Sequence, residues 1–529
     1  MTLVAQNISY ILPVGRTLFQ NVNFNILRGK VTGLVADNGT GKSVLLKIFA
    51  GNLMPTTGNV ERQGIIHYLP QHYGQFAHKT IAEALGISEK LYALQKITEG
   101  STETEFFEML AEDWEIEEKA QRALAKWNIN YSLETDFSRL SGGEKTKTLL
   151  ASIELINPDI VLMDEPTNHL DSYSREILYK WVQQTNTGLC LVSHDRALLN
   201  LCDNIAELTQ TGITNYGGNY DFYVAQKEQQ QLALNQKIEH ESKTLNLLQK
   251  KQREIAANKQ KASSRGEKKH QNKGTDKLTV NALKQSSEKT MSTINQRQAK
   301  KLDAAQENIT QLKAKKQAEN LMKTDFQSSN LHKGKLLFEA SNVNFVYRGE
   351  QNVFRENLVF SVYSGDRIAL EGSNGSGKST LIKLLTQQLK PIRGSVATHV
   401  KDWVMIDQEY SMLDRALSVF EQAESFNENA LPEHELKIRL NRFLFDAESW
   451  DKQCVTLSGG EMLRLCLCCI MIKNQSPDLI ILDEPTNNLD IKNMKVLTDT
   501  MSVYEGTLIV ISHDQWFKSE MKLNKVIAL

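Results

Sequence analysis

The chain has 529 residues, of which 40% are hydrophobic and 24% are charged, and its net charge is −1. This length and composition indicate two or three soluble globular domains. No apolar run approaches the ~20 residues of a membrane-spanning helix, and the first residues lack the basic and apolar pattern of a secretory signal, which argues against an integral membrane or exported protein. We therefore expect a cytoplasmic protein without a membrane-embedded part.

The first motif is a glycine-rich loop between an expected strand at residues 31–35 and an expected helix. The loop reads ADNGTGKS at residues 36–43. Glycines allow backbone N–H groups to surround phosphate oxygens, while the lysine reaches the β- and γ-phosphates and the serine ligates Mg²⁺. Ala36 replaces the first glycine of this pattern, and its methyl group is tolerated if φ is negative. The predicted nucleotide-binding residues are Asn38, Gly39, Gly41, Lys42 and Ser43.

Two further polar motifs follow in the first half. Gln71 ends a short apolar run, and SGGE at residues 141–144 precedes an expected helix. Ser-x-x-Glu is an ordinary helix cap, and this is the structural explanation of the motif. The two glycines also leave the N-terminal amides of the helix open to an anion, so we predict a binding role for this motif as well.

An apolar run at residues 160–163 then ends in two adjacent carboxylates, Asp164 and Glu165, followed by a proline. This pattern is typical of a buried strand that stops at its carboxyl end. One carboxylate there can hold Mg²⁺ while the next orients a water molecule. His194 ends another expected strand, where a lone histidine is most often structural.

The same motifs recur in the same order in the second half, with GSNGSGKS at residues 372–379 and SGGE at residues 458–461. Five separated motifs repeated in order indicate two copies of one domain. The first copy carries an additional segment at about residues 81–124. The predicted second site comprises Gly375, Gly377, Lys378, Ser379, Thr380, Gln408, Asp483, Glu484 and His513.

Tyr10 and Phe345 precede the two loop lysines by similar distances along the chain. An aromatic ring at that distance can stack on adenine, although core packing is the commoner fate of such a residue. We predict the stacking role for both residues.

This set of motifs, present twice, resembles the nucleotide-binding domains of ATP-binding cassette (ABC) proteins. The resemblance implies an α/β fold in which two P-loop ATPase domains pair head to tail and hold ATP between them. It also implies that Glu165 and Glu484 activate water, and that His194 and His513 hold the γ-phosphate. The implied magnesium ligands are Ser43, Gln71, Asp164, Ser379, Gln408 and Asp483. The residues that each half contributes to the site of the other are Ser141, Gly142 and Gly143, and Ser458, Gly459 and Gly460.

Residues 223–325 are expected to form a helical linker. No proline or aromatic residue occurs between Tyr223 and Phe326, and apolar residues recur with a period close to 3.5. This pattern predicts two long antiparallel helices, with a turn between about Ala262 and Gly274. A helix of ~35 residues extends roughly 50 Å.

The expected tip of this hairpin is basic. Residues 250–277 contain ten Lys and Arg residues against three acidic residues. Such a run of charges usually has no role beyond solvation, but its position at the expected tip of a long helical hairpin favours a polyanion partner. The lack of aromatic residues favours contact with the phosphates of folded RNA. The predicted RNA-contacting residues include Lys259, Lys261, Arg265, Lys268, Lys269 and Lys273.

The linker, the tandem cassettes and DEPTNHLD at residues 164–171 resemble the F subfamily of ABC proteins (ABC-F). Members bind the ribosome near the tRNA exit site and direct the interdomain helices toward the peptidyl-transfer centre. The resemblance implies a monomeric ATPase that relieves stalled or antibiotic-blocked translation, with rRNA and tRNA as partners. It implies domains at residues 1–222, 223–325 and 326–529, and it puts the additional segment in the place of the subfamily's ribosome-contacting arm.

Three other classes of ATPase share parts of this pattern but fit the sequence less well. The tandem ATPase subunit of an importer would need a membrane permease, and its halves generally have a short connection. Chromosome-associated ATPases insert their coiled coil within one cassette, whereas here it separates two complete ones. An Fe–S recycling factor would need an N-terminal cysteine cluster, whereas the six cysteines here are expected to be buried free thiols.

Replacing the ten basic linker residues with glutamine is expected to weaken ribosome binding and to flatten its salt dependence. Each phosphate contact that is lost should reduce the slope of log affinity against log salt by about one. Cosedimentation with ribosomes over a salt series measures both quantities. An unchanged slope would mean that the basic residues are only solvated.

Overall fold

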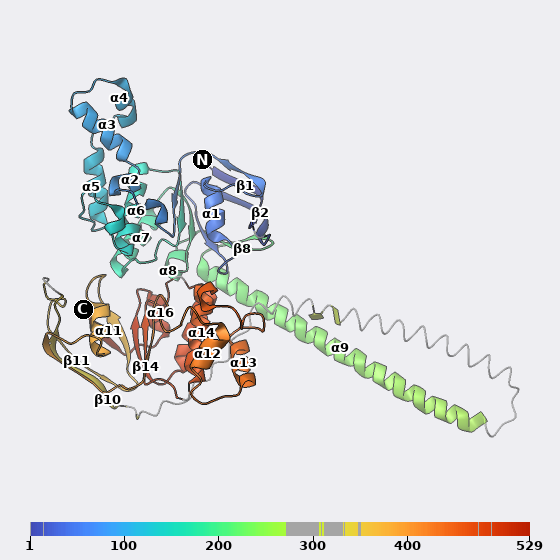
Figure 1. The fold of residues 1–529 in the computed structure, drawn as a ribbon. Helices are drawn as coiled ribbons and strands as arrows, with labels where there is room; N and C mark the ends of the chain where they lie inside the picture. Colours follow the sequence, from blue (N-terminus) through green and yellow to red (C-terminus); the bar gives the residue numbers. More distant parts are fainter. Residues whose placement is uncertain are drawn as a thin grey trace. The chain divides into compact units, whose positions relative to one another are not determined.

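The computed structural model describes residues 2–13, 15–270, 306–307, 309–310, 332, 334–347, 351–473, 475–487 and 489–529, without the side chains of residues 252 and 255–270. Packing divides the chain into two units, one made of Met1–Tyr223 and Met322–Leu529 and the other of Val224–Leu321. We call the elements from β1 to β9 the first cassette and those from β10 to β17 the second cassette (Figure 1).

The first cassette contains two sheets. The central sheet has the strand order β5(Ile66–Leu69), β6(Ile160–Asp164), β7(Gly188–Val192), β3(Val31–Val35), β8(Asn204–Thr209) and β9(Gly212–Gly217), and its strands are parallel except for the β8–β9 pair. The second sheet is antiparallel, with the order β2(Thr17–Leu27), β1(Thr2–Ile11) and β4(Thr57–Arg62). The helices are α1(Lys42–Ala50), α2(Ile81–Ala84), α3(Ser88–Thr98), α4(Thr104–Leu110), α5(Ile116–Lys126), α6(Gly142–Ile156), α7(Ser172–Gln184) and α8(Arg196–Leu199).

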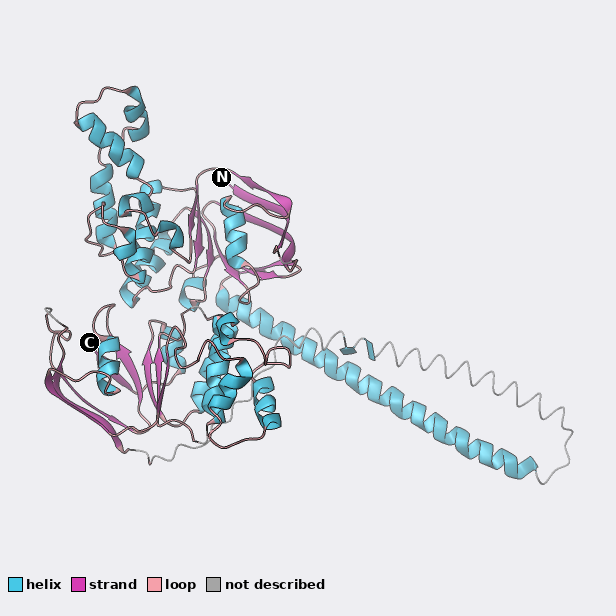
Figure 2. Ribbon diagram, viewed as in Figure 1, coloured by secondary structure: helices cyan, strands magenta, loops and turns pink. Residues whose placement is uncertain are grey.

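The second cassette repeats this plan. Its parallel sheet has the order β14(Trp403–Ile406), β15(Leu479–Asp483), β16(Thr507–Ile511), β12(Arg367–Glu371) and β17(Lys525–Ala528), and its antiparallel sheet the order β11(Leu358–Tyr363), β10(Leu336–Asn344) and β13(Arg393–Thr398). The helices are α11(Lys378–Leu385), α12(Val419–Ser425), α13(Glu433–Arg442), α14(Gly459–Ile472), α15(Ile491–Val503) and α16(Gln515–Glu520). Figure 2 shows helices beside the strands in both cassettes.

The strand β15 illustrates why the apolar runs before the carboxylates form buried strands. Leu479 and Ile481 pack with α11 and the antiparallel sheet, whereas Ile480 and Leu482 pack with the helices α12 to α16. Successive strand residues point to opposite faces, so a run that is apolar at every position needs cover on both faces. The double cover leaves Asp483 at the carboxyl end of the strand, where the polar motifs meet.

The additional segment of the first cassette consists of helices. The second cassette has α12 and α13 where the first has α2 to α5, so α3 and α4 are the extra elements. They pack on each other, with the rings of Tyr92 and Phe106 at 5.9 Å, and Figure 1 shows them at the end of this helical region. Lys90 and Lys119 both pair with Asp113, which ties the segment to α5.

The linker begins as one helix, α9(Tyr220–His270), which is longer than the ~35 residues that the sequence suggested. Residues 262–266, at the start of the region predicted to hold the turn, are helical. They continue the helix because the glycine at position 266 lowers helix propensity without breaking the helix. Of the second predicted helix, residues 306, 307, 309 and 310 are described, and they are helical. Lys259, Lys261, Arg265, Lys268 and Lys269 lie in α9, and Lys273 lies outside the described residues.

Candidate functional site

The two glycine-rich loops have the backbone of a phosphate cradle. Gly39 and Gly41 have φ values of 78° and 103°, and Gly375 and Gly377 have values of 81° and 96°. These lie in the left-handed region, where glycine has no steric cost. Gly41 and Gly377 are also the N-caps of α1 and α11, so the free amides of each first helical turn face the loop.

Both loop lysines fold back over their own loops. Nζ of Lys42 donates to the backbone oxygen of Ala36 at 2.8 Å and to Oδ1 of Asn38 at 3.3 Å. Nζ of Lys378 donates to the backbone oxygens of Gly372 and Ser373 at 2.7 and 3.1 Å. Burial lowers the pKa of both lysines. The φ angle of Ala36 is not positive, so its methyl group causes no backbone strain in the loop.

Parallel strands bring the other motifs to the same edge. Asp164 ends β6 and Glu165 follows it, while Asp483 and Glu484 stand in the same relation to β15. Burial raises the pKa of Glu165 to about 8 and that of Glu484 to about 7. Both glutamates also have positive φ, at 52° and 47°, which is rare for a residue with a side chain. Strain of this kind is retained where the surroundings hold a functional side chain in place.

A histidine stands beside each of these glutamates. Nε2 of His194 lies 3.2 Å from Oε1 of Glu165, and Nε2 of His513 lies 3.4 Å from Oε1 of Glu484. Neither contact is a hydrogen bond. Oε1 of Glu165 and Oε1 of Glu484 have no hydrogen-bond partner among the described residues. Burial, reinforced by Lys42, lowers the pKa of His194 well below its ordinary value, and burial lowers that of His513 to about 4. Both rings are therefore neutral near pH 7.

The donor set fits a magnesium nucleotide. Oδ1 of Asp164 and Oε1 of Glu165 and Glu484 are buried without a hydrogen-bond partner in the described part of the chain. A buried carboxylate oxygen in this state is costly unless a cation or a polar ligand meets it. Mg²⁺ prefers oxygen ligands together with phosphate, and the adjoining glycine loops supply amides for phosphate oxygens.

A cavity of about 1170 Å³ at the second glycine-rich loop, which we call the larger cavity, is lined by residues from both cassettes. Beside this cavity the two cassettes touch, and Nδ2 of Asn374 donates to the backbone oxygen of His169 at 3.1 Å. The second cassette contributes all nine residues predicted for the second site, namely Gly375, Gly377, Lys378, Ser379, Thr380, Gln408, Asp483, Glu484 and His513. The first cassette contributes Ser141, Gly142 and Gly143.

A cavity of about 400 Å³, which we call the smaller cavity, joins the first glycine-rich loop to Ser458 of the second cassette. It brings together Asn38, Gly39, Gly41, Lys42, Ser43, Gln71, Asp164, Glu165 and His194. Gly459 and Gly460 are not among the described residues that line it. The cassettes also meet where the backbone N–H of Asn38 donates to Oδ2 of Asp490 at 3.4 Å.

The SGGE motifs also form the helix caps that the structural explanation required. The backbone N–H of Ser141 donates to Oε2 of Glu144 at 2.8 Å, and Ser458 makes the same contact with Glu461. Both motifs form complete capping boxes at the starts of α6 and α14. Capping and cavity lining are compatible at the start of α6, because the four residues of its capping box, Ser141 to Glu144, also line the larger cavity.

The structure gives Tyr10 and Phe345 a different environment from the predicted one. Both are partly buried and pack against the apolar cores of their cassettes, and neither is among the described residues lining the two cavities. Tyr347 lines the larger cavity instead, with its hydroxyl 3.1 Å from Oγ1 of Thr380. The ring of Phe345 lies 5.0 Å from that of Tyr347. The stacking role of Phe345 stays a prediction, and Tyr347 is a further candidate for it. Spacing could not indicate Tyr347, because the chain leaves β10 at Asn344.

The first cassette has no aromatic residue at the position of Tyr347. Asn7 in β1 and Asn342 in β10 have matching positive φ values, 51° and 53°, and they align the two strands. Counted from this pair, Leu12 is the counterpart of Tyr347, and it packs against the core of the first cassette.

A family model described as ABC transporter matches residues 19–168 and 355–487, which is more than half of the chain. The chain belongs to the ABC transporter family. This ABC protein binds and hydrolyses ATP, as the sequence predicted, and the predicted α/β fold with tandem ATPase domains is confirmed. No described helix combines the length and the apolar character needed to cross a membrane.

Its relatives include members of the F family, which confirms the predicted resemblance to ABC-F. ABC transporter F family member 5 of Arabidopsis thaliana is 29% identical, over 97% of this chain and 73% of the relative. Ribosome protection protein VmlR of Bacillus subtilis (strain 168) is 29% identical, over 98% of this chain and 85% of the relative. The probable ATP-binding protein YbiT of Escherichia coli O157:H7 is 29% identical, over 96% and 92%.

Among solved structures, the fold is similar to that of archaeal ribosome recycling factor aABCE1 in complex with the ribosomal stalk protein aP1. The TM-score is 0.59 and the identity is 18%, over 99% of this chain and 87% of that chain. This likeness shows the fold alone, and the fold is the tandem arrangement of two cassettes.

Tyr347→Ala is expected to weaken ATP binding at the second site about fivefold or more, because stacking of an aromatic side chain on a base contributes about 1–3 kcal/mol. Equilibrium ATP binding to a Lys42→Ala background, in which the first site is disabled, measures the effect. Phe345→Leu serves as the comparison, since it keeps an apolar side chain against the core. A larger loss with Phe345→Leu than with Tyr347→Ala would favour Phe345 as the stacking residue.

Proposed function

We propose that this protein is a ribosome-associated ATPase of the ABC-F type that relieves stalled or antibiotic-blocked translation from a position near the tRNA exit site. The observation that carries the proposal is the composite larger cavity, in which the glycine loop of one cassette faces the SGG residues of the other. Support for the ribosome as partner comes from the name of the relative VmlR, a ribosome protection protein, and from the basic linker sequence.

In this proposal the cassettes close on two ATP molecules. Lys42 and Lys378 leave the carbonyl groups that they now contact and pair with phosphate oxygens, which carry more charge. Ser43, Gln71 and Asp164 would hold Mg²⁺ at one site, and Ser379, Gln408 and Asp483 would hold it at the other, where it would supply positive charge to the nucleotide phosphates.

Glu165 and Glu484 act on the attacking water. A raised pKa makes each of these carboxylates a stronger base than an ordinary glutamate, and its strained backbone holds it in one position. The neutral rings of His194 and His513 can donate a hydrogen bond to the γ-phosphate oxygens. The SGG residues of the opposite cassette contact the same phosphate, so its departure removes the bridge between the cassettes.

The linker would convert closure into contact with RNA. α9 carries basic residues along a rigid element, and its first turn belongs to the first cassette, where the hydroxyl of Tyr223 donates to Oε1 of Glu207 at 3.2 Å. Contacts from basic side chains to phosphates do not depend on the nucleotide sequence, which suits a folded RNA that is recognised by its shape. An importer subunit remains the alternative function, and the length of the helical linker argues against it.

The double variant Glu165→Gln and Glu484→Gln is expected to retain ATP and to stay on ribosomes, with hydrolysis lowered at least about 100-fold by the loss of the general base. Cosedimentation with ribosomes in ATP and a steady-state ATPase assay measure the two effects. The control is the double variant Lys42→Ala and Lys378→Ala, which should neither hold ATP nor sediment. A Gln variant that keeps ATP but sediments free of ribosomes would overturn the ribosome assignment.

A further inference from the structure

The two cassettes present different residues to each other's ATP sites. The sequence repeat aligns the start of α7 with the start of α15, since Asp171 and Asp490 cap the two helices in the same way. Relative to these caps, Ser172 in the first cassette corresponds to Ile491 in the second, and Arg175 corresponds to Met494. The first cassette therefore offers two polar side chains where the second offers two apolar ones.

Arg175 is held rigidly within the first cassette. Only 7% of the residue is exposed, its Nε donates to the backbone oxygen of Leu170 at 3.2 Å, and its Nη1 donates to Oδ2 of Asp195 at 3.2 Å. Tyr179 also donates to this oxygen, at 2.5 Å, and Oδ1 of Asp195 caps α8. Asp195 directly follows His194, the histidine of the first ATP site.

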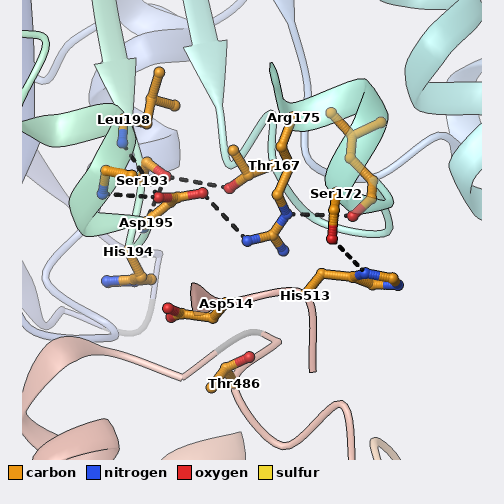
Figure 3. A network of polar contacts seen from close by, with 12 residues as sticks. Thr167, Ser172, Arg175, Ser193, His194, Asp195, Leu198, Thr486, His513 and Asp514 are labelled. Carbon is orange, nitrogen blue, oxygen red and sulfur yellow. Dashed lines mark hydrogen bonds and ion pairs between the residues drawn. The ribbon is translucent and has the colours of Figure 1, made fainter. Parts of the chain in front are cut away.

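The same arginine reaches the second ATP site. It lines the larger cavity together with Glu484 and His513. Its positive charge acts on Glu484 and on Asp514, next to His513, in the direction that favours the ionised carboxylates. Figure 3 shows the guanidinium group between Asp195 and the loop that carries His513 and Asp514.

Ser172 makes a second contact across the cassettes. Its hydroxyl lies 3.2 Å from Nδ1 of His513, the ring nitrogen remote from the one nearest Glu484 (Figure 3). A hydrogen bond to one ring nitrogen orients the imidazole and selects which nitrogen carries the proton. The first cassette thus contacts the histidine of the second site and places a charge beside its glutamate.

The described residues of the second cassette make neither of these two contacts at the first ATP site. Ile491 has no polar side-chain atom, and Met494 is buried in the apolar core of the second cassette with 1% of the residue exposed. Lys492 of the second cassette forms an ion pair with Asp37 of the first, with Nζ 2.9 Å from Oδ2. Both side chains are more than half exposed, so this pair contributes little to the stability of the contact. Oδ2 of Asp490 accepts the weak bond from Asn38 described above.

We propose that Ser172 and Arg175 are positioning residues for the second ATP site, through which the first cassette orients His513 and Glu484 and makes hydrolysis there depend on the loop of His194 and Asp195. The inference rests on the proposed ATP sites and deepens that assignment by making the two sites unequal. The second site is controlled across the contact between the cassettes, and no described residue of the second cassette makes a matching contact with the histidine or glutamate of the first site.

The test replaces Arg175 with methionine, the residue at the matching position of the other cassette. Arg175→Met is made in two backgrounds, Glu165→Gln, which leaves hydrolysis to the second site, and Glu484→Gln, which leaves it to the first. We expect kcat to fall about tenfold in the Glu165→Gln background with KM for ATP within about twofold, because misplacing a catalytic group by ~1 Å can cost up to about 100-fold. The loss in the Glu484→Gln background should be several-fold smaller.

Two further variants separate positioning from a structural role. Ser172→Ala leaves the pair of Arg175 with Asp195 intact and should also lower kcat selectively in the Glu165→Gln background. Arg175→Lys retains the charge and should recover part of the lost activity. Arg122→Met, on the exposed face of α5, is the matched control and should change neither background.

Equal losses of kcat in the two backgrounds, or an effect confined to KM, would overturn the inference. The inference would also be overturned if Ser172→Ala kept full activity and the loss of activity in Arg175→Met were accounted for by a lowered thermal stability of that variant. Failure of the ribosome assignment can be distinguished from failure of this inference. If the variants show the selective losses of kcat but the protein never sediments with ribosomes, the ATP sites are unequal and only the ribosome is excluded as partner.

Discussion

The two candidate sites are arranged around carboxylates buried at the carboxyl ends of two parallel strands, β6 and β15. β6 and β15 are apolar on both faces and therefore lie inside the protein, which carries Asp164, Glu165, Asp483 and Glu484 into surroundings with little water. The charge is only partly compensated, by Lys42 at one site and by Lys378 with Arg175 at the other. Such a site is costly when it is bare, and a ligand that carries both a cation and phosphates relieves that cost. Under the proposed function, the binding of nucleotide and the pairing of the cassettes would follow from the same electrostatic requirement.

The repeat produces two sites from one plan, and the structure shows where the copies differ. The second site has Tyr347, Ser172 and Arg175, whereas the corresponding positions of the first site are Leu12, Ile491 and Met494. All three differences place an aromatic or polar group at the second site. The cavities also differ in volume, since the one at the second glycine-rich loop, about 1170 Å³, is the larger. Two ATP molecules bound by this protein would thus meet different surroundings.

The motifs were predictable because each is contiguous in the chain. A glycine loop before a helix, a capping box and a strand that ends in two carboxylates are each defined by neighbouring residues, and the structure has each of them at the predicted residues. The repetition of the set made the tandem plan visible. The head-to-tail pairing did not follow from spacing and was implied only by the resemblance to a family. The extent of α9 was misjudged because weak helix formers near Gly266 do not by themselves end a helix.

The sequence by itself determined the two phosphate loops, the buried strands, the helix caps and the basic character of the linker, because these depend on local patterns of glycine, apolar and charged residues. Only the tertiary structure decided which side chains meet across the cassettes. It placed Tyr347 at the larger cavity, and it brought Arg175 and Ser172 to the histidine and glutamate of the opposite site. The physical reason is that such contacts join residues hundreds of positions apart, whose approach is set by the packing of whole sheets and helices and leaves no periodic trace in the sequence.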